Sequence, residues 1–468
     1  ADGRVVRGEF ADFPDSPGEQ WCDAQVLRIL RRRSLAALRS AIEPVSPAAY
    51  ARFLPAWQQI GARGAASGLD GLAGVIEQLA GVPLPASAVE PLVLAARVRD
   101  YSPAMLDELL ASGEVLWAGA GAPAGNAPAA DGWVTFHTAD SAPLTLAPGA
   151  PFDFGAAHRQ ILDTLGGGGA FFFRQLAGDT SEAELKTALW ELIWAGWVTG
   201  DTFAPMRTVL AGTRRSTPAH RSKRPPRLSR YSVAHAATRA ADPAVAGRWS
   251  RLPAPQEDFT VRAHHTAELL LHRYGVLTRG AVAAEAVPGG FAGLYKVLTA
   301  FEEAGRCQRG YFIESLGAAQ FALASTVDRL RGYLDGVDPA RPEYHAVVLA
   351  AADPANPYGA ALSWPAHPGT ARPGRKAGAL VVLVDGELAW FVERGGRSLL
   401  NFATGADAAE VQRAAAGALA GLIADRRVDG ILVERVDGVA VLEIRDSPTT
   451  TALAEAGFSR TPRGLRLR

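Results

Sequence analysis

The chain has 468 residues, 48% of them hydrophobic, which is enough for about three packed domains. Its 48 basic and 48 acidic residues balance to a net charge of zero, so only local patches could bind nucleic acid. Cys22 and Cys307 are far apart, which argues against a disulfide framework or structural zinc site and favours a reducing, cytoplasmic location. No apolar run reaches the roughly 20 residues of a membrane-spanning helix, so we expect no membrane partner.

The N-terminal residues contain a sequence that returns later in the chain. Residues 3–10 read GRVVRGEF, and residues 305–312 read GRCQRGYF. The later copy follows a predicted helix, where a strand and wing are expected. We therefore predict that residues 1–15 are the tail of a winged helix whose own helices lie upstream of Ala1. A helical segment is expected over residues 16–68.

Three segments share the pattern Leu-x-x-(Leu/Phe)-x-x-x-Gly, at residues 106–113, 189–196 and 298–305. Apolar residues three apart form one helix face, and the glycine can take the left-handed conformation that ends a helix. Upstream of each segment, a helix end is followed by a glycine and a few strand-like residues. The repeating unit is helix, short strand, helix, helix and two-stranded wing, which is a winged helix. We predict these modules at residues 69–150, 151–212 and 257–335.

The third helix of each module is acidic. Asp107 and Glu108 stand in the first, and the second has three glutamates against Lys186. A winged helix that reads bases places a basic third helix in the major groove. We therefore expect these helices to pack against neighbouring modules or subunits. Ser102, before a proline, and Ser181, three residues before Glu184, are expected to cap two of them.

One strongly basic run lies between the second and third modules, in a segment over residues 213–256 that is a linker or an extended wing. Residues 202–241 contain nine Arg or Lys and no acid. Backbone contact with DNA and a solvated loop are both open interpretations, because the chain has 44 Arg against 4 Lys and is arginine-rich everywhere. The candidate DNA-binding residues are Arg214, Arg215, Arg221, Lys223, Arg224, Arg227 and Arg230.

The pattern changes to sheet in residues 336–468, predicted as a β-rich, barrel-like module with helices. Two hairpins of type I′ are expected, at Asp385-Gly386 and at Asp437-Gly438. The helix between them should begin at Asp407. The fold class is therefore a multidomain α+β protein, with tandem winged-helix modules followed by this β-rich module.

Motifs for catalysis are few. No GxxxxGK[ST] or DExH-type box is present, so the chain carries no ATPase motor, and GGGG at residues 166–169 is interpreted as a turn. His264, Glu268 and His272 share a helix face, but we favour a polar surface over a metal site and expect no metal. No catalytic residue is assigned.

Five stretches resemble the C-terminal region of the bacterial large helicase-related (Lhr) proteins. They are residues 19–45, 51–61, 353–362, 372–388 and 456–468. The resemblance implies a full-length superfamily 2 helicase, an ATP-dependent hydrolase that moves 3′ to 5′ on DNA and acts in repair. ATP and Mg²⁺ belong to its helicase core, and this chain needs no cofactor. For the present chain, the resemblance implies a non-motor region that forms a homo-oligomer such as a tetramer, contacts its own helicase core and helps bind single-stranded or 3′-tailed DNA.

Two alternative functions remain open. The tandem layout is similar to that of AlkZ-type DNA glycosylases, and some Lhr family members are linked to uracil removal through an Asp. No motif assigns that Asp here, although Asp353, Asp385 and Asp446 lie in or beside C-terminal loops. The third interpretation, a winged-helix DNA-binding regulator, is disfavoured by the weakly basic helices.

Overall fold

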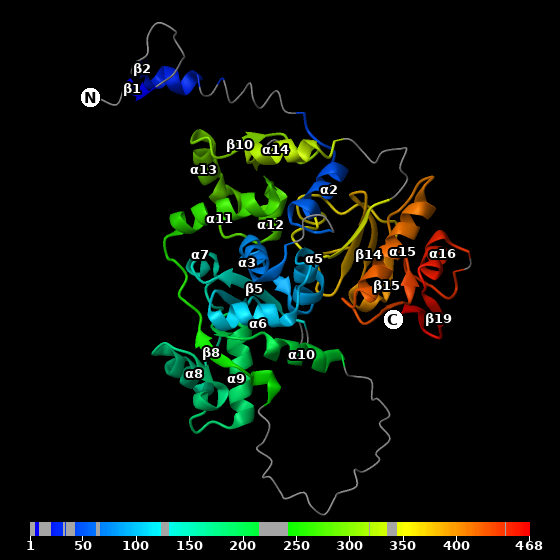
Figure 1. The fold of residues 1–468 in the computed structure, drawn as a ribbon, viewed down its shortest axis with the longest axis horizontal. Coiled ribbons are helices and arrows are strands. Elements are labelled where there is room, and N and C mark those ends of the chain that lie inside the picture. The colour runs from blue at the N-terminus through cyan, green and yellow to red at the C-terminus, as the bar shows by residue number, and fades with distance from the viewer. Residues whose placement is uncertain are drawn as a thin grey trace, which may run out of the picture.

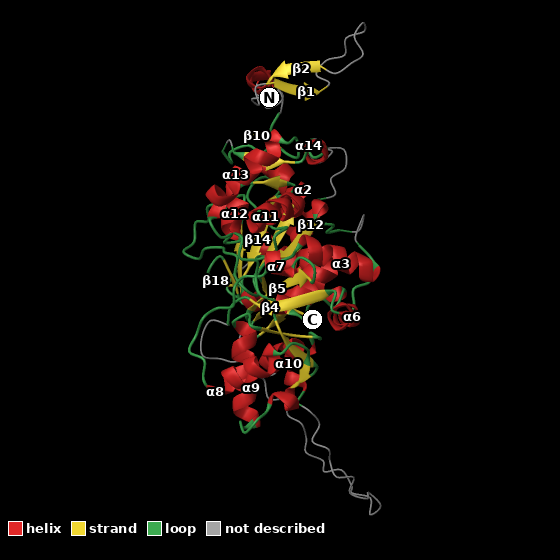
Figure 2. Cartoon of the chain, turned by 90° about the vertical axis from the view of Figure 1, so that its left-hand side faces the viewer, coloured by secondary structure: helices red, strands yellow, loops and turns green. Residues whose placement is uncertain are grey.

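The computed structural model describes residues 5–8, 20–30, 33, 43–61, 66–122, 131–214, 242–317, 319–334, 344–444 and 446–468. Three winged-helix modules stack as a column in which the first module lies between the third and the second, and a β-rich module flanks one side of the column (Figure 1). Seen from the side, the described elements form an elongated body (Figure 2). Among the helices in these ranges, none is both long and apolar enough to cross a membrane.

The first module has an irregular middle helix in which a π-helical stretch, η1, lies between two short α-helical turns. Its elements are α3 (Gly68–Gln78), β3 (Leu84–Pro85), α4 (Ala86–Ala88), η1 (Val89–Leu94), α5 (Ala95–Arg97), α6 (Pro103–Ser112), β4 (Val115–Gly119) and β5 (Trp133–Thr138). The short helix α7 (Ala142–Thr145) follows.

The second module has a single 3₁₀ turn, η2, as its middle helix. Its elements are α8 (Ala156–Gly166), β6 (Phe171–Phe172), η2 (Phe173–Leu176), α9 (Glu182–Trp194), β7 (Val198–Gly200) and β8 (Arg248–Arg251). Helix α10 (Ala204–Arg214) and the turn η3 (Pro243–Val245) come between the two wing strands in the chain. The module therefore extends past residue 212, because β8 pairs with both β6 and β7.

The third module has the most regular set of helices. Its elements are α11 (Phe259–Tyr274), β9 (Val276–Leu277), α12 (Arg279–Ala284), α13 (Gly290–Glu303), β10 (Gln308–Gly310) and β11 (Gln320–Ala322), and helix α14 (Ala324–Arg331) follows. All three modules share one sheet arrangement, in which the second wing strand lies between the first wing strand and the strand that follows the first helix. The tandem winged-helix prediction is confirmed.

A glycine with positive φ ends the third helix of every module. The φ values are 81° at Gly113, 76° at Gly196 and 74° at Gly305. Only glycine takes this left-handed conformation without a steric cost, and it turns the chain from the helix into the wing. The repeated glycine in the sequence pattern therefore marks a real structural requirement.

The predicted helix starts are correct, but only one of the three side chains forms its capping bond. The Ser181 hydroxyl accepts a hydrogen bond from the Glu184 backbone N–H at 3.3 Å. Ser102 makes no such bond at the start of α6. Asp407 begins the long C-terminal helix, and its carboxylate accepts a bond from the Tyr344 hydroxyl at 3.1 Å instead of capping.

The C-terminal module has an open six-stranded sheet in the order β12-β13-β14-β15-β17-β18 and a three-stranded sheet in the order β16-β20-β19. Its β-rich character is confirmed, but the described strands form no closed barrel. Its elements are β12 (Ala346–Ala350), β13 (Leu380–Val384), β14 (Glu387–Val392), η4 (Arg394–Gly396), β15 (Ser398–Asn401), α15 (Ala408–Ala424), β16 (Ile431–Val433), β17 (Arg435–Val436), β18 (Val439–Ala440), α16 (Pro448–Glu455), β19 (Ser459–Thr461) and β20 (Gly464–Leu467).

Both predicted two-residue hairpins are present in this module. Asp385 and Gly386 have φ of 49° and 87°, and Asp437 and Gly438 have φ of 53° and 86°. Positive φ at both central residues defines the type I′ turn, whose twist matches that of the strands it joins. The hairpins connect β13 to β14 and β17 to β18.

The N-terminal part of the chain contains a hairpin, a helical stretch over residues 24–30 and helix α2 (Pro47–Trp57). Strands β1 (Val5–Gly8) and β2 (Gln20–Asp23) pair antiparallel, so the segment expected to be helical over residues 16–68 contains a strand. This hairpin lies apart from the other elements in both views (Figures 1 and 2). Helix α2 joins the third module instead, where Val45 bridges Ile313.

Candidate nucleic-acid interface and a cavity between the modules

The acidic third helix of the first module, α6, packs against the second module, as predicted. Asp107 on α6 accepts hydrogen bonds from the Thr202 hydroxyl and the Phe203 N–H, both at 2.8 Å. It also pairs with Arg207 of α10 at 2.6 Å, and Arg207 binds Glu90 of the first module with two further bonds. Burial favours a raised pKa for Asp107, but these hydrogen bonds outweigh it and hold the pKa below its usual value. Asp107 therefore links the first winged-helix module to the second.

The candidate DNA-binding cations lie almost wholly outside the described residues. Arg214 is the last residue of α10. The other six lie outside: Arg215, Arg221, Lys223, Arg224, Arg227 and Arg230. The described elements on either side of this segment, α10 and η3, pack against each other. The described parts of the chain before and after this segment therefore lie close together in the second module.

The three C-terminal aspartates occupy different settings. Asp353 is fully buried and accepts two hydrogen bonds from the Arg97 guanidinium, at 2.7 and 2.9 Å. Asp385 is the first of the two central residues of a tight turn and accepts a hydrogen bond from the His345 N–H at 3.1 Å. Asp446 is exposed beside helix α16. Asp353 connects modules, because Arg97 belongs to the first winged helix.

The His264, Glu268 and His272 group forms a polar surface rather than a metal centre. His264 Nδ1 lies 3.6 Å from the Glu268 carboxylate, which also pairs with Arg306. Within the described ranges, no group of three His, Cys, Asp or Glu side chains could hold a metal ion.

The four glycines at residues 166–169 include two with positive φ, 84° at Gly168 and 92° at Gly169, as the turn prediction requires.

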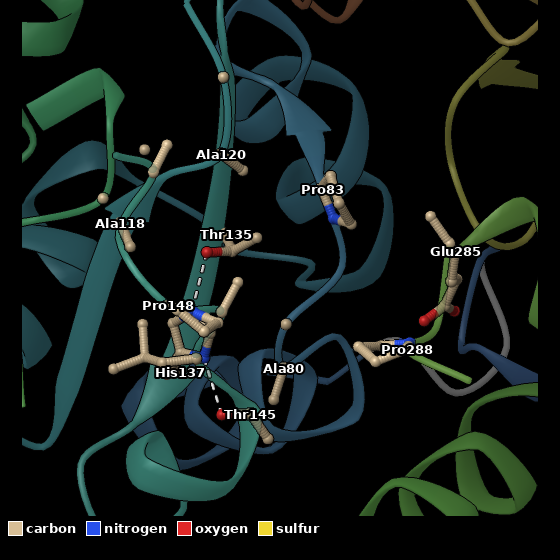
Figure 3. A pocket seen from close by; sticks show the side chains of 18 of the residues that line it. Ala80, Pro83, Ala118, Ala120, Thr135, His137, Thr145, Pro148, Glu285 and Pro288 are labelled. Carbon is tan, nitrogen blue, oxygen red and sulfur yellow. Dashed lines mark hydrogen bonds between the residues drawn. The ribbon is translucent and has the colours of Figure 1, made fainter. Parts of the chain in front are cut away.

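A cavity of about 700 Å³ lies where the three winged-helix modules meet. Its walls come from the wing of the first module, residues 144–152, the end of α9, helix α11 and the turn at residues 285–288. Figure 3 shows His137 and its threonine partners on one side, with Glu285 and Pro288 across from them. Most of the lining is apolar, and the few polar groups are therefore the ones that can orient a ligand.

Two threonines hold the ring of His137 in place. His137 Nε2 lies 2.8 Å from the Thr135 hydroxyl and Nδ1 lies 2.7 Å from the Thr145 hydroxyl (Figure 3). The ring is buried, and burial lowers the pKa of His137 to about 3. His137 is therefore neutral near pH 7, with one nitrogen that donates and one that accepts.

The opposite wall of the cavity carries a buried ion pair between Arg273 and Glu285. Arg273 of α11 pairs with Glu285 and donates to the backbone oxygens of Gln78 and Ala80. The Tyr274 hydroxyl donates to Glu285 at 2.6 Å, and burial raises the Tyr274 pKa well above its usual value. These contacts attach the third module to the first. They also leave Glu285 with its charge already compensated.

Sequence reasoning did not find this cavity. The alternation of Thr135 and His137 on one face of a strand is a weak signal that also fits an ordinary buried strand. Glu191 and Trp194 of α9, and Arg262 of α11, come from two other modules. Only the packing of the modules brings these residues together.

Comparison with known proteins finds similarity to helicase-related proteins. The winged-helix domain of the large helicase-related protein matches residues 45–139, and a second such winged-helix domain matches residues 256–341. The chain is 69% identical, over its whole length, to the Lhr helicase/probable uracil glycosylase of Mycolicibacterium smegmatis. It is 39% identical, over 95% of its length, to the Lhr helicase/uracil glycosylase of Escherichia coli.

The chain spans about a third of the length of these curated relatives, 31% and 30% respectively. Among solved structures it is similar to the Streptomyces sahachiroi DNA glycosylase AlkZ, at 13% identity and a TM-score of 0.46. This similarity covers 84% of the present chain and 100% of the AlkZ chain.

Proposed function

Because the chain belongs to the large helicase-related (Lhr) family, we propose that it is the non-motor region of an Lhr-type helicase that binds DNA during repair. The observation that carries this proposal is the 69% identity to an Lhr helicase along the entire chain. In this proposal ATP and Mg²⁺ bind to the helicase core, and the present residues hold the DNA on which that core moves. The preferred DNA is single-stranded or carries a 3′ single-stranded tail.

The acidic third helices indicate that the chain contacts the sugar-phosphate backbone of DNA rather than the edges of its bases. α6 carries Asp107 in an internal ion pair, and the first turn of α9 carries Glu182 and Glu184. Helices with such charges attract phosphate poorly. The basic segment that begins at Arg214 is the part of the chain with the right charge, so we assign it the backbone contact.

The test is the salt dependence of binding to a 3′-tailed DNA, measured by fluorescence anisotropy. Each phosphate contact on single-stranded DNA contributes a slope of about 0.7 in log K against log salt. We expect a variant with glutamine at Arg214, Arg215, Arg221, Lys223, Arg224, Arg227 and Arg230 to bind more weakly and to lose several such contacts from its slope.

A matched control removes exposed arginines elsewhere. Arg426, Arg460 and Arg468 of the C-terminal module are exposed, and their replacement by glutamine should leave the slope close to that of the unmodified chain. An unchanged slope in the sevenfold variant would mean that the basic segment does not contact DNA. Failure of the unmodified chain to bind DNA at low salt would contradict the DNA-binding proposal itself.

We also propose that the chain assembles into a homo-oligomer, such as a tetramer. Apolar side chains exposed on the N-terminal hairpin and the helix after it support this. Trp21 is 64% exposed and Val5 is 56% exposed. Exposed apolar surface of this kind is usually covered by a protein partner.

Uracil excision is the second candidate function, and the names of both curated relatives favour it. In this reaction water adds to C1′ of the deoxyribose as the bond to N1 of uracil breaks. The base leaves as an anion, and it takes up the proton that the water releases. Among the cavity carboxylates, Glu285 is bound by Arg273, whereas Glu191 is half-exposed and bonded to His158 at 2.7 Å. Glu191 is therefore our candidate to position the water and to accept its proton on the way to the leaving base.

The excision test uses a uracil-containing single strand and counts alkali-labile sites. We expect cleavage by the unmodified chain and a loss of at least about a hundredfold in Glu191→Gln, the lower range for a group that transfers a proton. Glu184→Gln changes an exposed carboxylate on the same helix and should cleave normally. Absence of cleavage by the unmodified chain would exclude this second function and leave the DNA-binding proposal in place.

A further inference from the structure

The wall of the cavity offers an oxygen that accepts hydrogen bonds and has no proton left to donate. The Thr145 hydroxyl donates to the Ser141 backbone oxygen at 3.1 Å, so its oxygen accepts the proton on His137 Nδ1. His137 Nε2 must then accept, and its donor is the Thr135 hydroxyl. The proton of Thr135 is therefore committed to the ring, and its oxygen keeps lone pairs for a ligand in the cavity that Thr135 lines.

The rest of the cavity suits a flat, polar-edged ligand. Trp194 and Phe152 supply aromatic faces, on which nucleic-acid bases stack. Arg262 donates through Nη2 to the Leu146 backbone oxygen at 2.9 Å, and within the described residues its other nitrogens have no recorded partner. Arg262 can therefore bind a carbonyl or phosphate oxygen. A volume of about 700 Å³ admits a nucleoside.

We propose that this cavity receives an unpaired base with an imide N–H, uracil or thymine, extruded from single-stranded DNA, and that Thr135 reads its N3–H. This inference rests on the DNA binding proposed above. An imide base presents a donor at N3 between two carbonyl oxygens. Its N3–H meets the acceptor-only oxygen of Thr135, and a carbonyl faces Arg262. Cytosine presents a lone pair at N3, which would oppose that of Thr135 and cost binding.

Thr135, His137 and Thr145 thus recognise the base as well as stabilising the fold. The Thr145 bond fixes the tautomer of His137, and His137 fixes the proton of Thr135. Because His137 is buried and neutral, the arrangement does not change near pH 7. The specificity should therefore depend on one hydroxyl oxygen whose removal leaves the shape of the cavity almost unchanged.

The experiment compares three fluorescein-labelled 15-nucleotide strands that differ only at the centre, which holds uracil, cytosine or a tetrahydrofuran abasic analogue. Dissociation constants are measured by anisotropy with the complete 468-residue chain. We expect the uracil strand to bind roughly three- to tenfold more tightly than the cytosine strand, the range for one hydrogen bond. In Thr135→Val this ratio should fall to about one, with unchanged affinity for the abasic strand.

Two further variants control for effects on folding. Thr199 is a buried threonine of β7 whose hydroxyl has no hydrogen-bond partner among the residues that the structure describes, so Thr199→Val makes the same chemical change away from the cavity. It should keep the full uracil-to-cytosine ratio. Thr135→Ser retains the hydroxyl and should restore the ratio even if Thr135→Val is less stable because His137 Nε2 has lost its donor.

Three outcomes would overturn the inference. The first is a ratio near one in the unmodified chain. The second is a ratio that survives in Thr135→Val, which would place the reading elsewhere. The third is failure of all three strands to bind, which would contradict the proposed DNA binding, and the cavity assignment would fall with it. If every strand binds tightly but the uracil and cytosine strands bind equally well, the cavity assignment is rejected and the DNA-binding proposal stands.

Discussion

At the scale of single residues, the buried charges join modules. Arg97 and Asp353 are 256 positions apart and both have fully buried side chains, yet they form a two-bond ion pair that Gln58 extends through a bond at 2.7 Å. A buried charge that lost its partner would destabilise the fold by several kcal/mol. Asp353 was a candidate functional carboxylate in the sequence. Its position explains it as a structural connection between the first module and the C-terminal sheet.

His137 makes folding stability depend on pH, and the sign follows from its lowered pKa of about 3. An unfolded histidine titrates near 6.5, so between pH 6.5 and about 3 the unfolded chain binds a proton that the folded chain does not. Stability is thus lost as the pH falls below 6.5. When the pH is lowered from 6.5 to 4.5, we expect the free energy of unfolding of His137→Asn to fall by about 2 kcal/mol less than that of the unmodified chain.

The measurement is urea unfolding at both pH values, followed by circular dichroism. Other histidines and carboxylates contribute to both proteins, so only the difference between them is interpreted. His265→Asn alters a histidine that is only partly buried and serves as the control. An identical pH dependence of the unmodified chain and His137→Asn would show that His137 is solvated rather than buried.

At the scale of elements, two hairpins share a turn sequence but differ in their surroundings. Gly386 and Gly438 have φ of 87° and 86°, in equivalent type I′ turns. A Cβ added at Gly386 would lie 2.1 Å from the backbone oxygen of Ala48, whereas no atom of the described residues lies within 4 Å of one added at Gly438. The first hairpin therefore touches helix α2, and the second projects into open space.

This difference predicts unequal costs for the same substitution. Gly438→Ala should reduce the free energy of unfolding by about 1 kcal/mol, the cost of a left-handed alanine. Gly386→Ala should cost at least about 2 kcal/mol more, because α2 must also move to relieve the overlap. Urea unfolding of both variants measures the difference. Equal losses would show that the hairpin and α2 are not in contact in solution.

At the scale of the whole molecule, the hydrophobic cores do not follow the order of the modules. The first and second winged helices share one core. The third shares a core with α2 and one face of the C-terminal sheet, which includes Val381 and Leu383. The other face, with Val382, packs on α15 and α16 and reaches Leu92 of the first module. A sheet covered on both faces needs strands that are apolar throughout, and the sequence of β13 meets this need.

Oligomer formation belongs to this scale, because it depends on a surface rather than on a site. We expect light scattering after size-exclusion chromatography to give a mass that is a multiple of the chain mass. Trp21→Ser combined with Ile29→Ser should shift the distribution toward the monomer, since both side chains are exposed apolar residues of the N-terminal hairpin and the helix after it.

Val439→Ser provides the matched control, because Val439 is exposed to a similar extent, 49%, beside a hairpin of the C-terminal sheet. It should leave the mass unchanged. A monomer at micromolar concentration in the unmodified chain would exclude the proposed assembly. An oligomer that survives the double substitution would place the interface on another surface.

Much of the local structure follows from short sequence patterns. The helix-ending glycines at residues 113, 196 and 305, and the two Asp-Gly turns, sit where backbone geometry allows few alternatives. Side-chain caps were less predictable, because a serine or aspartate before a helix can bind another partner. Asp407 binds Tyr344 in this way. Strand β8 was missed, because its pairing partners lie 49 or more positions earlier.

The sequence by itself determined the repeating winged-helix unit, its acidic third helices and the β-rich C-terminal module, since each depends on residues within a few turns of one another. Only the tertiary structure decided that α2 joins the third module, that Arg97 pairs with Asp353, and that three modules enclose the cavity around His137. Contacts between residues hundreds of positions apart leave no periodic signal in one sequence. They are selected by how apolar faces and buried charges find partners when the modules pack.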